Sequence, residues 1–91
     1  MENPQSTPEI RPDSELEELI LRKLHIHAAE QPYLLVTPEM FSPPIALHDI
    51  WRIGLRLKDR KFLKSPPGDD PRGWWMRIST EGILYCEQKG L

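Results

Sequence analysis

The chain has 91 residues, of which 38% are hydrophobic and 29% charged, and its formal net charge is −2 at pH 7. This length allows one small domain, in which about 60% of the unfolded chain's surface becomes buried. The sequence has no run of about 18 apolar residues, which argues against a membrane-spanning helix. Its polar, acidic start lacks the basic and apolar regions of a signal peptide, so we expect a cytoplasmic protein.

Charge is distributed unevenly along the chain. Residues 1–45 contain eight acidic and three basic residues, a net charge of −5, whereas residues 46–77 contain eight basic and four acidic residues, a net charge of +4. A basic second half can indicate a nucleic-acid-binding surface, although in so short a chain it can also arise by chance.

Neither a catalytic nor a metal-binding motif is found in the sequence. The GxSxG, Walker A and HExxH patterns are all missing, and Asp69 and Asp70 fall in a Pro/Gly-rich turn where water surrounds both carboxyl groups. His25 and His27 would diverge by about 200° on a helix, too far to share a metal ion. The single Cys86 excludes an intrachain disulfide and is expected to be a buried thiol. We therefore expect no enzyme, no cofactor and no metal.

Prolines recur every fourth residue near the N-terminus among polar side chains. Such a composition cannot bury enough apolar area to offset the entropy lost on ordering. The sequence predicts a disordered tail over residues 1–12 and one domain over residues 13–91.

The first predicted helix covers residues 14–30. Ser14 followed by Glu17 fits a capping box, and apolar residues then recur at helical spacing. Pro32 ends the pattern, because proline cannot continue a helix.

The second predicted helix is very short. Thr37 and Pro38 suit a helix start, but two further prolines follow within about a turn and a half. Ser42 is then the predicted N-cap of a third helix over residues 43–60.

The third predicted helix is amphipathic. Its expected core face comprises Leu47, Ile50, Trp51, Ile53, Gly54 and Leu57. The opposite arc carries a row of basic side chains: His48, Arg52, Arg56 and Arg60. Asp49 and Asp59 share that arc and lower its charge, so a solvated surface is an alternative to a binding face.

A hairpin and a last helix complete the predicted domain. Residues 62–64 read as one strand, residues 65–73 as a turn and residues 74–78 as the returning strand, whose two adjacent tryptophans point to opposite faces. Ser79 or Thr80 caps the final helix, which can pack on the first.

The segments SPPIALHDIWRIGLRLKDRKFLK and RISTEGILY carry a family resemblance. They resemble the recognition helix with its exit strand, and the closing wing strand with the entry to the last helix, of the winged helix-turn-helix family, in particular small bacterial regulators of the MarR and PadR type. Lys61 stands where that family commonly has glycine. The resemblance implies an α+β, mainly α, winged-helix fold: three helices, a β-hairpin wing and a C-terminal helix.

By the same resemblance the chain is expected to be a small DNA-binding transcriptional regulator or accessory factor. The residues implied to contact double-stranded DNA are His48, Arg52, Arg56, Arg60, Lys61, Lys64, Arg72 and Arg77. His48, Arg52 and Arg56 would read the major groove. Arg60, Lys61 and Lys64 would hold phosphates, and Arg72 and Arg77 would lie on the wing. Two-fold DNA sites favour a homodimer, joined through the first and last helices.

The alternative is a winged-helix module that binds a protein partner and no DNA. The overall pI near 5.9 suits this alternative better. Pairing of Asp49 with Arg52, or of Arg56 with Asp59, would favour it, since paired arginines are not free to hold phosphates.

Overall fold

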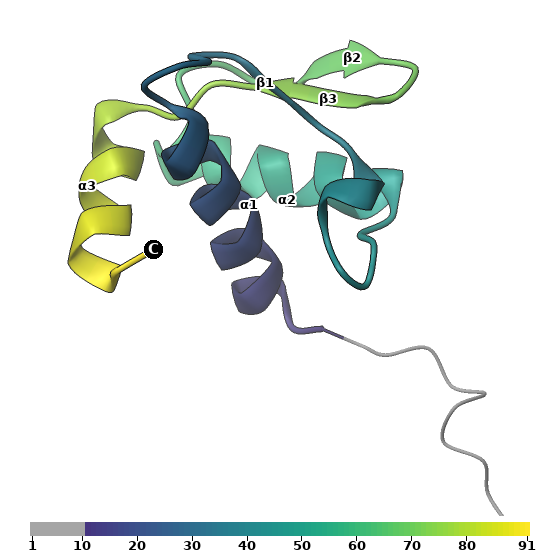
Figure 1. Ribbon diagram of the computed structural model, residues 1–91, viewed down its shortest axis with the longest axis horizontal. Coiled ribbons are helices and arrows are strands. Elements are labelled where there is room, and N and C mark those ends of the chain that lie inside the picture. The colour runs from purple at the N-terminus through teal and green to yellow at the C-terminus, as the bar shows by residue number, and fades with distance from the viewer. Residues whose placement is uncertain (1–10) are drawn as a thin grey trace, which may run out of the picture.

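The computed structural model describes residues 11–91 as a mixed α+β fold that is mainly helical (Figure 1). Its elements in chain order are α1 (Asp13–His27), β1 (Leu34–Val36), the 3-10 helix η2 (Pro38–Met40), α2 (Leu47–Asp59), β2 (Gly68–Asp70), β3 (Gly73–Met76) and α3 (Thr80–Lys89). Most of the predicted tail lies outside the described residues. Between residues 11 and 91, no helix has both the length and the apolar character to cross a membrane.

The three strands form an antiparallel sheet in the order β1-β3-β2. The predicted hairpin is confirmed, but its first strand is not at residues 62–64, where only a bridge between Leu63 and Ile78 forms. Strand β2 instead lies inside the segment predicted to be a turn. The reason is Pro66 and Pro67, which have no N–H to donate to the ladder, so regular pairing starts only at Gly68.

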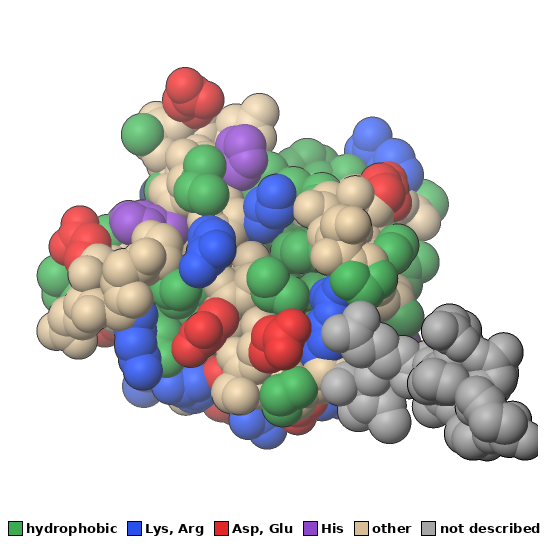
Figure 2. All heavy atoms as spheres, turned by 60° about the horizontal axis from the view of Figure 1, so that its bottom comes forward, with side chains coloured by type: hydrophobic (Ala, Val, Ile, Leu, Met, Phe, Trp, Pro, Cys, Tyr) green, Lys and Arg blue, Asp and Glu red, His purple; other side chains and the backbone are tan. Residues whose placement is uncertain are grey.

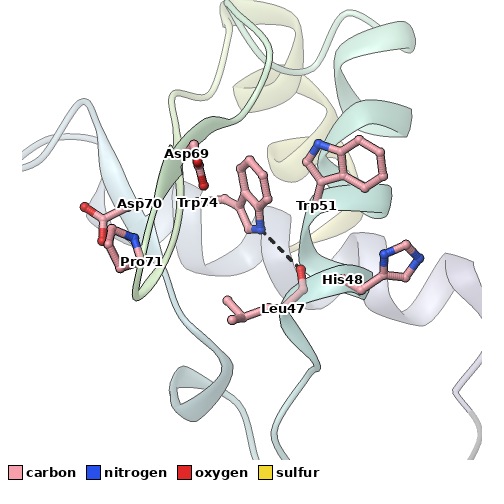
Figure 3. A pocket seen from close by; sticks show the side chains of 7 residues that line it. All are labelled: Leu47, His48, Trp51, Asp69, Asp70, Pro71 and Trp74. Carbon is pink, nitrogen blue, oxygen red and sulfur yellow. Dashed lines mark hydrogen bonds between the residues drawn. The ribbon is translucent and has the colours of Figure 1, made fainter.

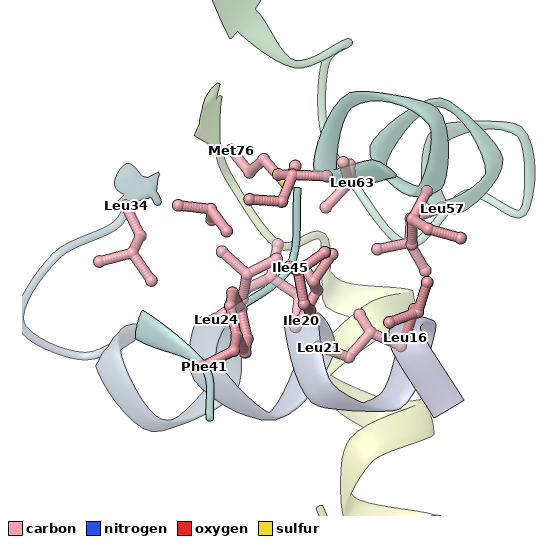
Figure 4. Close-up of a cluster of buried hydrophobic side chains, with 14 of the residues drawn as sticks. Leu16, Ile20, Leu21, Leu24, Leu34, Phe41, Ile45, Leu57, Leu63 and Met76 are labelled. Carbon is pink, nitrogen blue, oxygen red and sulfur yellow. The ribbon is translucent and has the colours of Figure 1, made fainter. Parts of the chain in front are cut away.

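The helices and one face of the sheet enclose the core (Figures 1 and 4). α1 contacts α2 and α3, and α2 lies against β3. The buried apolar side chains are Leu16, Ile20, Leu21, Leu24, Leu34, Val36, Phe41, Ile45, Ile50, Ile53, Leu57, Leu63, Met76, Ile78 and Cys86. All three α-helices and the inner sheet face contribute to this set, so the core holds the elements in fixed relation.

Both predicted caps at the first and third helices are wrong. α1 begins at Asp13, one residue before Ser14, and ends at His27 rather than at residue 30. Acidic side chains in its first turn complement the positive end of the helix dipole in place of the cap.

α2 begins at Leu47, four residues later than predicted, and Ala46 rather than Ser42 occupies its N-cap position. A residue that precedes proline is disfavoured in the helical region, and two such positions follow one another at 42 and 43. The segment therefore stays non-helical and turns back, so that the Ile45 N–H donates to the Pro38 carbonyl at 3.4 Å and the Ile45 side chain, which is 3% exposed, enters the core. The predicted short second helix is the single turn η2.

Ser79 caps α3 as predicted and also ties the end of α2 to it. Its hydroxyl accepts a hydrogen bond from the Gly82 N–H at 3.0 Å and donates one to the Lys61 carbonyl at 2.6 Å. Lys61 has a φ of 71°, a left-handed conformation that glycine adopts at less cost. A close junction thus joins the end of α2 to the start of α3.

Candidate functional site

Helix α2 presents two very different faces, and the first is its row of arginines. Arg52 donates hydrogen bonds to Asp13 of α1 at 2.9 Å and to Asp49 of its own helix at 3.1 Å. The hydrogen bond from Arg52 to Asp13 is the largest cause that lowers the pKa of Asp13 below its ordinary value. The pKa of Arg52 rises correspondingly. This arginine is thus neutralised by two carboxylates.

Glu17 of α1 pairs with the other two arginines of the row. Its side chain is only 4% exposed, and its two carboxylate oxygens accept hydrogen bonds from Arg56, at 2.9 Å, and from Arg60. The three arginines of the row therefore have three acidic partners, Asp13, Glu17 and Asp49. The molecular face in Figure 2 likewise has acidic and basic side chains interspersed over it.

The remaining basic residues predicted to bind DNA are spread over other surfaces. Lys61 and Lys64 line a hollow between the end of α2 and the start of α3, together with Lys58, which sequence reasoning did not include. Arg72 pairs with Asp70 at the tip of the hairpin. Arg77 places its guanidinium 5.2 Å from the centre of the Tyr33 ring. The eight predicted residues are not brought together into one site.

The second face of α2 borders an open aromatic cleft (Figure 3). The cleft has a volume of about 290 Å³ and lies between the first turns of α2 and the β2–β3 hairpin. Its lining residues are Leu47, His48, Trp51, Asp69, Asp70, Pro71 and Trp74.

Three rings follow one another along this cleft. The centres of the His48 and Trp51 rings are 5.9 Å apart, and those of Trp51 and Trp74 are 6.1 Å apart. Trp74 Nε1 donates a hydrogen bond to the Leu47 carbonyl at 3.2 Å, the dashed line in Figure 3. This bond satisfies the polar edge of the indole and fixes its ring against the helix.

Two residues of the cleft were predicted to belong to the core, and for them the prediction is wrong. Leu47 is 42% exposed and Trp51 36% exposed. The register of β2 with β3 puts Asp69 beside Trp74 on the side of the hairpin that faces α2. Because the hairpin offers a carboxylate there instead of a large apolar side chain, the start of the apolar stripe of α2 is left uncovered.

The acidic side of the cleft contains one engaged carboxylate and one free one. Asp70 accepts hydrogen bonds from Arg72 and from Trp75 Nε1, and these lower its pKa to about 2, with the side chain of Arg72 as the largest cause. Asp69 is exposed and forms neither an ion pair nor a side-chain hydrogen bond within residues 11–91. It is therefore the available anion at the cleft.

The two helices implied to join a homodimer contact each other within one chain. Ile26 on α1 and Leu84 on α3 nevertheless remain exposed. His25 Nδ1 lies 2.8 Å from the Leu91 carbonyl, which gives this histidine a structural partner. Cys86 is buried, and burial raises the pKa of its thiol, as expected for an unreactive core cysteine.

Comparison with known proteins adds no assignment: no family model matches the sequence, and neither a curated protein nor a solved structure matches the chain.

Proposed function

We propose that this chain is a non-enzymatic protein-interaction module of winged-helix layout, and that it docks a segment of a protein partner in the cleft between α2 and the β2–β3 hairpin. The layout rests on the element order: helix, strand, short helix, helix, hairpin, helix. The docking rests on one observation above all, the open aromatic cleft beside Leu47 and Trp51.

Exposed aromatic side chains that are held rigid suit protein recognition. They bury much apolar area on binding and lose little conformational freedom, which is why tryptophan and tyrosine dominate interface energetics. Trp74 is held by its bond to Leu47, and Trp51 lies between His48 and Trp74 in tilted ring contacts. A partner would therefore meet a preformed surface.

The arginine row supports the same proposal because its side chains are already engaged and are poorly placed to bind DNA. Phosphate binding requires cations that can exchange their counterions for phosphates. To reach DNA, Arg56 and Arg60 would have to leave Glu17, and a carboxylate that is 4% exposed would lose both partners. An uncompensated buried charge is costly, so the row is better suited to joining α1 and α2 than to reading a groove.

The test is selection of binders from a random peptide library displayed on phage, followed by affinity measurement on purified variants. Peptides that dock in the cleft should lose at least about tenfold in affinity with Trp51→Ala, as expected for a buried aromatic anchor. Tyr33→Ala is the control, because Tyr33 is an aromatic residue that is 52% exposed and lies outside the cleft. Selected peptides whose affinity does not change with Trp51→Ala would contradict the proposal.

Double-stranded DNA is the second candidate partner, for a transcriptional regulator that would use the lysines beside the start of α3, two of which the resemblance also implies, instead of the arginine row. Lys58, Lys61 and Lys64 line the hollow beside the start of α3 and form no ion pair within residues 11–91. Glu81 borders the same hollow and reduces its net charge.

Anisotropy of a fluorescent random-sequence duplex at about 50 and 200 mM salt tests this candidate. If the lysines hold phosphates, binding weakens with salt and Lys61→Ala/Lys64→Ala weakens it further. Arg22→Ala/Lys23→Ala removes the same charge from α1 and serves as control. Equal effects of the two double variants would indicate only non-specific attraction.

A further inference from the structure

We infer that the segment docked in the cleft is an extended, proline-containing peptide with lysine or arginine next to its prolines. This inference rests on the proposed docking function and names the chemistry of the partner. It is argued from the shape of the aromatic surface, the charges around it and the size of the cleft.

The shape of the surface favours proline. Trp51 and Trp74 present flat rings tilted by 37° to each other, and the one polar group of Trp74 is already bonded to Leu47. Trp74 therefore offers a ligand apolar ring face only, whereas Trp51, whose indole N–H forms no hydrogen bond within residues 11–91, offers ring face and one donor for a backbone carbonyl of the ligand. Proline-rich segments dock in aromatic-lined grooves because the polyproline II helix is preformed and costs little entropy to bind.

The charges around the cleft favour a basic partner. Asp69 is free, whereas Asp70 is engaged by Arg72. Among residues 11–91, neither lysine nor arginine lines the cleft. An acidic ligand would thus meet an unpaired carboxylate, while a lysine or arginine could pair with Asp69 at the edge of the aromatic surface.

The size of the cleft favours a short anchoring segment. A volume of about 290 Å³ lies at the lower end of the range for ligand pockets. Such a cleft takes a few side chains of a chain that crosses it. An extended peptide meets this requirement better than a folded surface, which would have to present a protrusion.

The experiment uses three fluorescein-labelled peptides and the full chain, with binding followed by anisotropy. The first alternates proline triplets with single arginines, the second carries glutamate in place of arginine, and the third carries alanine in place of proline. We expect the first to bind the wild-type chain and the other two to bind at least several-fold more weakly. Because this comparison changes only the probe, it does not depend on a variant that folds.

Two variants locate the charge effect. Asp69→Asn should weaken the proline–arginine probe by about two- to fivefold, the range for an exposed ion pair, whereas Asp69→Lys should bring the glutamate probe up to or above the arginine probe. Asp59→Asn is the control, since Asp59 is an exposed acid on α2 outside the cleft.

Equal binding of the arginine and glutamate probes, or of the proline and alanine probes, overturns the inference. If library peptides depend on Trp51 but contain neither proline nor basic residues, the inference fails while the docking function stands. If every library peptide binds Trp51→Ala as well as the wild type, the docking function itself fails.

Discussion

The two faces of α2 differ in whether their side chains have found partners within the chain. On the face toward α1, Arg56 and Arg60 are paired with Glu17. On the face toward the hairpin, Leu47 and Trp51 are left substantially exposed. The comparison teaches that a row of charged side chains indicates a binding site only if no oppositely charged side chain of the same chain pairs with it. Exposed apolar surface is the more informative sign of a binding site in this molecule.

The largest effect is expected from breaking the charged face. Arg56→Ala combined with Arg60→Ala leaves Glu17 buried without a partner, and we expect the free energy of unfolding to fall by about 3–5 kcal/mol, the usual cost of an orphaned buried charge. Urea denaturation followed by circular dichroism measures this change.

Addition of Glu17→Gln to that double variant provides its control. The amide removes the unpaired charge while it keeps the shape of the side chain, so part of the lost stability should return. A double variant that loses less than about 1 kcal/mol, the value typical of surface pairs, would show that Glu17 is solvated instead.

The packing of α2 against the hairpin should be the next most sensitive feature. A Cβ atom at Gly54 would lie 2.6 Å from the Pro67 side chain and 2.8 Å from the end of Met76. Gly54→Ala is therefore expected to destabilise the fold by about 1–3 kcal/mol through overpacking. Thermal unfolding measures the effect, and Gly68→Ala is the control, because its Cβ would have its nearest neighbour at an ordinary 3.4 Å. If Gly54→Ala and Gly68→Ala destabilise the fold equally, the result would argue against the close approach of α2 to the hairpin.

Removal of the aromatic face should affect binding more than folding. Trp51→Ala loses its ring contacts with His48 and Trp74, for which we expect a cost of about 1 kcal/mol in the free energy of unfolding. Peptide affinity should fall much further, by at least about tenfold. A Trp51→Ala chain that unfolds at room temperature would instead place this residue among the core.

The smallest effect concerns the tip of the hairpin and its pH dependence. The pKa of Asp70 is about 2, below its ordinary 3.8, so its contribution to stability is present above pH 3.8 and is lost as the pH falls through about 2. Arg72→Ala should raise this pKa toward 3.8, which NMR titration of the carboxyl carbon measures. Arg77→Ala is the control on the same hairpin, and a similar rise in both variants would mean that the direct bonds from Arg72 are not the cause.

Local features of the fold were predictable because their causes are local. The apolar stripe of the first helix, the hairpin and the Ser79 cap all follow from residues a few positions apart. The Ser42 cap was wrong because two consecutive prolines keep the backbone that follows it out of the helical region. The Ser14 cap was wrong because the helix already begins at Asp13, directly after Pro12.

The candidate site was harder to predict because it depends on contacts between distant segments. Asp13 and Glu17 are four residues apart, as are Arg52 and Arg56, so each pair lines one side of its helix. This matched spacing was the available signal for their pairing, but only the packing of α1 on α2 brings the two rows together. Periodicity likewise placed Leu47 and Trp51 on the apolar side of α2, but it did not indicate that both side chains would stay exposed.

The bonds of Glu17 also have a mechanical consequence for the cleft. They join the C-terminal half of α2 to α1, and the Arg52–Asp13 pair joins the part of α2 nearer the cleft to the same helix. The hairpin wall reaches α2 through a single hydrogen bond within residues 11–91, from Trp74 to Leu47. Because this bond joins the two walls of the cleft, a widening between Leu47 and Trp74 would break it, so the Trp74 indole N–H reports on the separation of the two walls.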